Sequence, residues 1–124
     1  MPSSSSSDSG QTPAWKQFEQ HAATFLENQG FEILERNYRA GRREIDIIAR
    51  DKRTLVFVEV KSSGSKQFGH PAERVDNRKI GFLTQAAQQY LEKHDIGDLD
   101  LRFDVITFSD GRLEHFPNAF EAAE

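Results

Sequence analysis

Two apolar segments of the chain carry charged residues of the types that can bind a metal ion and act on a phosphate group. The first, residues 44–49, holds Asp46 among isoleucines, and the second, residues 55–61, ends in Glu59 and Lys61. Burying a carboxylate or an ammonium group costs free energy unless the group has a partner or a function. Asp46, Glu59 and Lys61 are therefore our candidate catalytic residues.

The second segment is the more informative of the two. Side chains alternate between the faces of a strand, so Glu59 and Lys61 share the face of Leu55 and Phe57, while three valines occupy the other. Large apolar groups on both faces are typical of a strand that is buried on both sides. We expect this strand to be central in its sheet.

The register of the two strands decides how close the carboxylates come. If residues 51–54 form the turn, Arg50 pairs with Leu55 and Asp46 lies opposite Glu59. Directly opposed residues have Cβ atoms about 4.5 to 5.5 Å apart, where like charges repel. Mg²⁺, or Mn²⁺, would neutralise them, with a nearby carbonyl, water and a substrate phosphate as its other ligands.

Lys61 and Glu19 are the residues that would extend this site. Lys61 would orient an attacking water or offset charge on a phosphorus-centred transition state. Glu19 follows Trp15 by four residues in a predicted helix, so it faces the sheet and is a third candidate metal ligand. A helix-surface carboxylate is an equal alternative for Glu19, and a structural salt-bridge cluster is the weaker alternative for the other three.

The elements that position these residues follow from periodicity and turn signals. Gly30 ends the first helix and Asp76 caps the second. We predict a helix over 13–29, strands over 31–38, 44–49 and 55–61, a helix after Asp76, and strands over 101–108 and 112–116. The domain then covers residues 13–117, between a disordered tail over 1–12 and a C-terminal tail over 118–124.

Composition limits the classes of protein that the chain can belong to. Its 124 residues suffice for one compact domain, and the absence of cysteine excludes a disulfide scaffold, a thiolate nucleophile and Cys-ligated metal sites. No apolar run approaches the roughly 18 residues of a membrane span, and there is no signal-peptide core. We expect a cytoplasmic protein without a membrane partner.

The separate motifs together resemble a known family. Asp46 followed by Glu59-Val60-Lys61 is similar to the D-xn-E-x-K core of the restriction-endonuclease-like nucleases. The matches to the YraN-like family of small bacterial proteins are Glu19, Ala22, Leu26, Gly30, Asn37-Tyr38-Arg39, Glu44-Ile45-Asp46-Ile47-Ile48, Val56-Phe57-Val58-Glu59-Val60-Lys61, Phe68-Gly69-His70-Pro71, Lys79 and Arg102-Phe103-Asp104-Val105. This resemblance covers nearly the whole ordered chain.

The resemblance implies a fold, a cofactor and a substrate. The fold would be α/β, a restriction-endonuclease-like αβββαβ core with a mixed sheet flanked by helices. Similarity to archaeal Holliday junction resolvases implies a Mg²⁺-dependent nuclease that acts on branched or otherwise structured DNA and can form a homodimer. Asp46 and Glu59 would be the metal ligands, Lys61 the catalytic lysine and Glu19 the acidic residue of the first helix.

The charge of the chain is unevenly distributed. The formal net charge is −4, yet residues 36–79 hold 12 Lys and Arg against 6 Asp and Glu. A basic segment of this kind draws a phosphate backbone to one face. The candidate substrate-binding residues in it are Arg39, Arg42, Arg43 and Lys79. For Lys79, as for Arg78, the position favours a solvated first helical turn over a phosphate ligand, and the preceding loop leaves the second interpretation open.

Two hypotheses of different classes follow. The first is a metal-dependent endonuclease that hydrolyses phosphodiester bonds of DNA. The second is a non-catalytic DNA-binding or complex-assembly module that keeps the nuclease fold. The 2′-hydroxyl distinguishes RNA from DNA, and no feature of the sequence is specific for its presence or its absence. An RNA-directed nuclease is therefore a third option.

Overall fold

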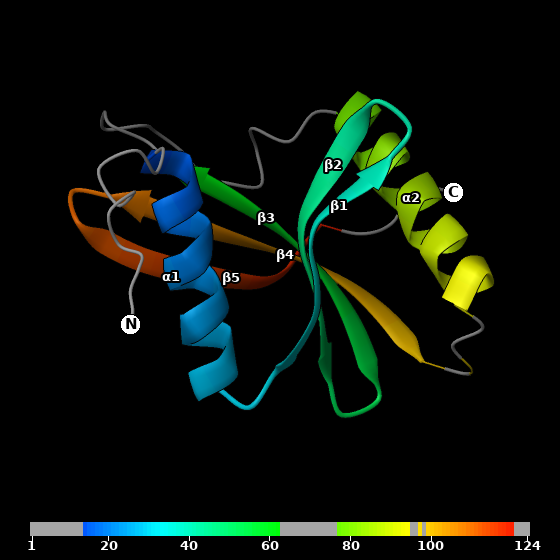
Figure 1. Ribbon diagram of the computed structural model, residues 1–124, viewed down its shortest axis with the longest axis horizontal. Coiled ribbons are helices and arrows are strands. Elements are labelled where there is room, and N and C mark those ends of the chain that lie inside the picture. Colours follow the sequence, from blue (N-terminus) through cyan, green and yellow to red (C-terminus); the bar gives the residue numbers. More distant parts are fainter. Residues whose placement is uncertain (1–13, 63–76, 95–96, 98, 121–124) are drawn as a thin grey trace, which may run out of the picture.

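The structure, a computed structural model, describes residues 14–62, 77–94, 97 and 99–120, which form two helices and a mixed sheet (Figure 1). The elements are α1 (Ala14–Asn28), β1 (Glu32–Ala40), β2 (Arg43–Asp51), β3 (Thr54–Ser62), α2 (Asn77–His94), β4 (Asp100–Ser109) and β5 (Arg112–Phe120). In the described residues the sheet has five strands in the order β1-β2-β3-β4-β5. Only β3 and β4 pair in parallel. This arrangement confirms the predicted α/β fold, a mixed sheet flanked by helices and consistent with an αβββαβ core.

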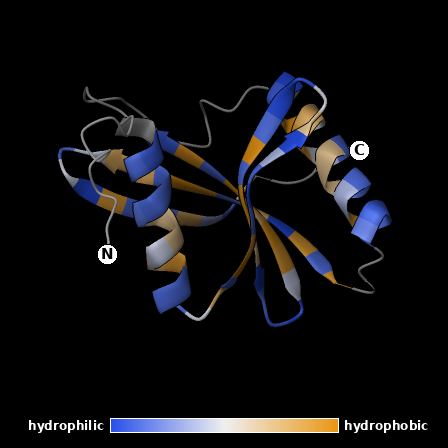
Figure 2. Cartoon of the chain, in the orientation of Figure 1, coloured by the Kyte–Doolittle hydropathy of each residue, from blue (hydrophilic) through white to orange (hydrophobic). Residues whose placement is uncertain are grey.

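The helices pack on opposite faces of the sheet, and each covers its own hydrophobic cluster. Ala22 and Leu26 of α1 pack with Val56 and Val58 of β3. On the other face, α2 contributes Leu83, Ala87 and Tyr90 to a cluster that includes Leu55 and Phe57. Figure 2 shows hydrophobic residues along the strands and hydrophilic residues at the hairpin turns. The central strand β3 is therefore buried on both faces, as its sequence predicts.

The pairing between β2 and β3 stops before either strand ends. Their pairing includes Arg50 with Leu55, which confirms the predicted register, and its last pair is Ile47 with Val58. Beyond that pair β2 continues with β1 alone, and β3 continues with β4 alone as far as Ser62. In Figure 1 the tip of the β1–β2 hairpin runs toward the start of α2, whereas the end of β3 runs toward α1. Asp46 and Glu59 are the next residues after the last pair.

A change of face in β2 accompanies this divergence. Ile47 packs in the cluster under α1, but Ile45 packs in the cluster under α2. Strict alternation would put both side chains on the same face. The backbone of β1 explains the switch, because Asn37, between the pairs Arg36–Ile47 and Tyr38–Ile45, has a left-handed φ of 52°. The hairpin thus twists sharply at the level of Asn37 and Asp46.

One predicted element end agrees with the structure, and one does not. The first helix ends at Asn28, just before Gly30, whose φ of 99° is easy only for glycine, and the N–H of Phe31 donates to the carbonyl of Leu26. The last strand was predicted to end at Phe116 but continues to Phe120, so residues 118–120 belong to the sheet and not to a tail. The N–H of Asn118 donates to the buried Asp104 and extends the strand.

Some predictions fall outside the described residues: the tail over 1–12, the cap at Asp76 and the loop motif over 68–71. Within the part of the chain that is described, no helix is long and apolar enough to cross a membrane.

Candidate active site

Asp46 lies where β2 leaves β3, and its carboxylate replaces a backbone partner there. Its Oδ2 accepts a hydrogen bond of 2.8 Å from the backbone N–H of Val60. The prediction that Asp46 opposes Glu59 across a continuing ladder is therefore modified, because the ladder stops one residue earlier. The side chain itself, and not the strand backbone, brings Asp46 against the Glu59–Lys61 segment of β3.

Glu59 is buried, and it lies between two lysines. Lys79 Nζ donates to Glu59 Oε2 at 2.5 Å, and Lys61 Nζ is 3.9 Å from the same oxygen. The side chain of Glu59 is 10% exposed, against 23% for Lys61 and 33% for Lys79. The predicted site residues Glu59 and Lys61 are thus together, and α2 adds Lys79 to them. Lys79 therefore contacts a residue of the site directly, whereas the alternative interpretation placed it in a solvated first helical turn.

Glu19 faces inward from α1, as one of the two interpretations required, and it is 6% exposed. Its Oε1 accepts a hydrogen bond of 2.8 Å from the side-chain amide of Asn37 in β1. Its charge also contributes to raising the pKa of Asp46. Glu19 therefore belongs to the same electrostatic neighbourhood, and its role as a metal ligand stays a prediction.

Asn37 is the site residue to which sequence reasoning assigned no role. Asparagine is unfavourable inside a strand and tolerates left-handed backbone better than most residues. An Asn within a strand pattern, among the family-like residues, was the available signal. Because its amide holds Glu19 and its backbone turns the hairpin, Asn37 links α1 to the point where β2 departs.

The electrostatics of the site are those of negative charge held away from water. Burial and the nearby charge of Glu59 raise the pKa of Asp46 from 3.8 to about 7. The hydrogen bond from Val60 and the charge of Lys79 oppose this rise without cancelling it. A carboxyl group whose pKa is this high gains from a cation more than an ordinary surface carboxylate does.

The donor set suits a hard cation that completes its shell elsewhere. Among the residues that the structure describes, no three His, Asp or Glu side chains are close enough to hold a metal ion by themselves. Mg²⁺ does not need such a cage, because it commonly takes one or two carboxylates and fills its other positions with water and substrate phosphate. Asp46 and Glu59, with the diverging backbone between them, fit this kind of ligation.

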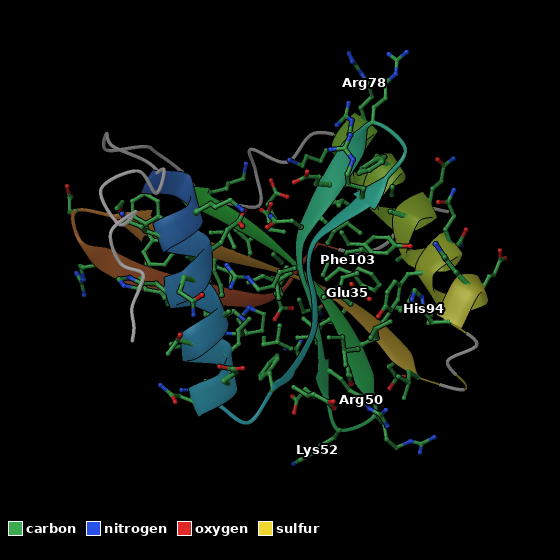
Figure 3. The ribbon with its side chains drawn as sticks, viewed as in Figure 1. Glu35, Arg50, Lys52, Arg78, His94 and Phe103 are labelled. Atoms are coloured by element: carbon green, nitrogen blue, oxygen red, sulfur yellow. The ribbon has the colours of Figure 1, made fainter. Side chains whose placement is uncertain are left out.

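The predicted substrate-binding arginines gather at one side of the site. Arg39, Arg42 and Arg43 lie at the tip of the β1–β2 hairpin, and all three are exposed. Arg43 lies over the ring of Phe82, 5.2 Å from its centroid, which ties the hairpin to α2. In Figure 3 the Arg78 side chain extends from α2 at this same end of the molecule. Their role in substrate binding stays a prediction.

Not all of the basic segment lies near the carboxylates. Arg50 and Lys52 lie at the β2–β3 turn, at the opposite end of the sheet from Arg78 (Figure 3). The simple count of charges along residues 36–79 therefore overstates the charge at the site.

Another buried acid, Asp104 of β4, is fully enclosed by donors. It is 0% exposed and accepts two hydrogen bonds from Arg102, at 2.8 and 2.9 Å, one from the N–H of Asn118, and a contact of 2.7 Å from His115 Nε2. Burial alone would raise the pKa of Asp104, but His115, Arg102 and Asn118 hold it below its usual range. This cluster joins β4 to β5.

Fold and site together define a class of protein. It is an α/β protein of helix, three strands, helix and two strands, consistent with a restriction-endonuclease-like core, in which two central strands diverge around a pair of acidic residues. The profile of the uncharacterised protein family UPF0102 matches residues 18–108, and the chain belongs to this family. The match confirms the YraN-like resemblance of the motifs.

Relatives in this family are similar over most of their length. A UPF0102 protein of Persephonella marina is 44% identical over 106 residues, which cover 86% of this chain and 91% of the relative. One from Chlorobium phaeobacteroides is 47% identical over 115 residues, with 85% and 91% covered. One from Geobacter metallireducens is 47% identical over 106 residues, with 82% and 87% covered.

Proposed function

We propose that this protein is a Mg²⁺- or Mn²⁺-dependent phosphodiesterase that acts on DNA. The observation that carries the proposal is the pair Asp46 and Glu59 at the point where β2 leaves β3, in which burial and the charge of Glu59 raise the pKa of Asp46 to about 7. Perturbed acids of this kind cluster at functional sites. The donors around Asp104, by contrast, hold the pKa of that buried acid below its usual range.

Each residue of the site has a task in this proposal. Asp46 and Glu59 would hold the cation, which lowers the pKa of a bound water and offsets charge on the scissile phosphate. Lys79 holds the Glu59 carboxylate from the α2 side through its hydrogen bond. Lys61, on the same strand face as Glu59, would orient the attacking water and stabilise the negative charge that develops on the phosphoryl oxygens.

The preference for a nucleic acid substrate rests on the basic residues beside this site. The exposed Arg39, Arg42 and Arg43 present cations at the hairpin tip, where a phosphate backbone gains electrostatic attraction. The net charge of −4 and the acidic remainder of the chain limit indiscriminate binding. Branched or otherwise structured DNA is the substrate class that the resemblance to junction resolvases favours.

The test is a cleavage assay with branched, single-stranded and duplex DNA in the presence of Mg²⁺ or Mn²⁺. Wild-type protein is expected to cleave at least one of these, and Asp46→Ala to cleave none. The matched control is Asp100→Ala, because Asp100 is exposed and pairs with Thr54 at the other end of β3. Full activity of the control would show that loss of an acid by itself is harmless.

Equal cleavage by wild type and Asp46→Ala, or no cleavage of any substrate, would rule the proposal out. If the wild type binds DNA without cleaving it, and titration calorimetry detects no Mg²⁺ or Mn²⁺ binding, the protein is the DNA-binding module of our second hypothesis. The two hypotheses thus differ in one metal titration, in which only the enzyme loses its signal on Asp46→Ala.

A further inference from the structure

A pocket lined by charged, amide and imidazole side chains lies between α1 and β1, beside the candidate active site. It has a volume of about 710 Å³ and is lined by Lys16, Gln17, Gln20, His21, Arg36 and Asn37. Among the described residues that line it, none is acidic, although the chain as a whole carries a net charge of −4. Its chemistry is therefore that of cations and amides, which suits an anion with hydrogen-bonding groups attached.

The pocket is adjacent to the site through Asn37. This residue lines the pocket, and its amide donates to Glu19 Oε1 at 2.8 Å. Along β2 the position that faces Asn37 is that of Asp46, because the flanking pairs are Arg36 with Ile47 and Tyr38 with Ile45. A ligand in the pocket is thus one residue layer away from the acidic residues.

A hydrogen bond across the pocket holds the side chain of Arg36, one of its two cationic residues, in place. Arg36 Nη1 donates to Gln20 Oε1 at 2.8 Å, which fixes the guanidinium across the gap between β1 and α1. Gln20 Nε2 donates in turn to Thr24 Oγ1 at 3.2 Å. Arg36 keeps further N–H donors, because a guanidinium has five and cannot lose its charge.

We propose that this pocket binds an unpaired nucleotide segment next to the phosphate that Asp46 and Glu59 would act on, a proposal that rests on the nuclease function. Lys16 and Arg36 contact phosphates, while the amides of Gln17 and Gln20 supply both donors and acceptors for base edges. A duplex hides those edges within base pairs, whereas an unpaired base presents them. The nucleic-acid strand then runs along β1 from the pocket at Arg36, past the level of Asp46, toward the hairpin arginines.

The test measures binding in EDTA, where no metal-dependent cleavage occurs. Fluorescence anisotropy would compare a labelled single-stranded oligonucleotide with a blunt duplex of the same length. The variant is Lys16→Gln with Arg36→Gln, at two exposed positions. The matched control is Arg50→Gln with Lys52→Gln, the same change of charge at the far end of the sheet (Figure 3).

We expect the pocket variant to bind the single strand about tenfold more weakly, with the slope of log affinity against log salt reduced by about 1.4, or about 0.7 for each lost phosphate contact. The loss on duplex should be smaller, and the control should bind both probes as the wild type does. Equal losses in the two double variants would mean that bulk charge binds the DNA and would overturn the proposal. Equal losses on single strand and duplex would also overturn it.

A cleavage assay on the same preparations separates this proposal from the nuclease itself. If the wild type cleaves DNA in Mg²⁺ and the pocket variant binds single strands normally, the pocket proposal is wrong and the nuclease stands. If no protein cleaves DNA but the pocket variant alone loses single-strand binding, the pocket stands and the nuclease is wrong.

Discussion

Two acids of the sheet, the fully buried Asp104 and the half-buried Asp46, meet opposite electrostatic environments. Asp104 is enclosed by Arg102, His115 and a backbone N–H, which hold its pKa below the usual range despite its burial. Burial, and after it the charges of Glu59 and Glu19, raise the pKa of Asp46 to about 7, against the opposing hydrogen bond from the backbone of Val60. Donors of the chain itself surround the first carboxylate, whereas the second has a single backbone donor and lies near two other acids. The difference indicates which acid holds strands together and which one is available for a ligand.

The largest effect should come from breaking the Asp104 cluster. Asp104→Asn removes the charge that pairs with Arg102 and leaves buried donors without their acceptor. We expect the free energy of unfolding to fall by about 3 to 5 kcal/mol. Urea denaturation would measure this, with Asp100→Asn in the exposed part of the same strand as control. A loss below about 1 kcal/mol would show that Asp104 does not stabilise the fold as a paired charge.

Asp46→Asn should act in the opposite direction on the metal-free protein. The fold raises the pKa of Asp46 from 3.8 to about 7, so folding favours the protonated carboxyl group. The contribution of this group to the free energy of unfolding is therefore fully present below pH 3.8 and is lost as the pH rises to about 7. Removing the charge should therefore stabilise the protein at pH 8 by about 2 to 4 kcal/mol, and by much less at pH 5. Paired urea titrations at the two pH values measure the difference. A variant less stable than the wild type at pH 8 would contradict the comparison.

Binding of Mg²⁺ at Asp46 should stabilise the folded protein without any mutation. At pH 8, Mg²⁺ at tenfold its dissociation constant should raise the free energy of unfolding by about 1.4 kcal/mol. The gain should vanish in Asp46→Asn and persist in Asp104→Asn if that variant folds. Thermal melting with and without Mg²⁺, at matched ionic strength, is the measurement. The same shift in Asp46→Asn would place the metal elsewhere.

The smallest effect on stability should come from Asn37. Asn37→Gly keeps the left-handed backbone, because glycine adopts a positive φ freely, but removes the amide that holds Glu19. We expect metal affinity to fall about tenfold, while the free energy of unfolding falls by about 1 kcal/mol because the buried Glu19 loses its donor. Asn37→Ala loses the same amide and should in addition cost about 1 kcal/mol of backbone strain.

Isothermal titration with Mn²⁺ and urea denaturation would separate these two losses. Unchanged metal affinity in both Asn37 variants would mean that the contact with Glu19 serves the fold alone.

Much of the fold could be predicted because it depends on local patterns. Alternation in residues 55–61 predicts a central strand, and Gly30 predicts a helix end, since both follow from the period and the backbone freedom of neighbouring residues. The predicted end of β5 was wrong because a hydrogen bond between the N–H of Asn118 and Asp104 holds the last residues of the strand, and these two residues are 14 positions apart along the chain. No local signal reports such a contact.

The sequence by itself determined which residues could do the chemistry: Asp46, Glu59 and Lys61 are charged residues in strands that are otherwise apolar, and burial makes them costly without a function. Only the tertiary structure decided how they meet. The early end of the β2–β3 pairing lets Asp46 reach Val60, α2 brings Lys79 onto Glu59, and Asn37 ties Glu19 to the hairpin. The physical reason is that strand periodicity assigns a side chain to a face, whereas its neighbours across a site depend on packing between distant segments.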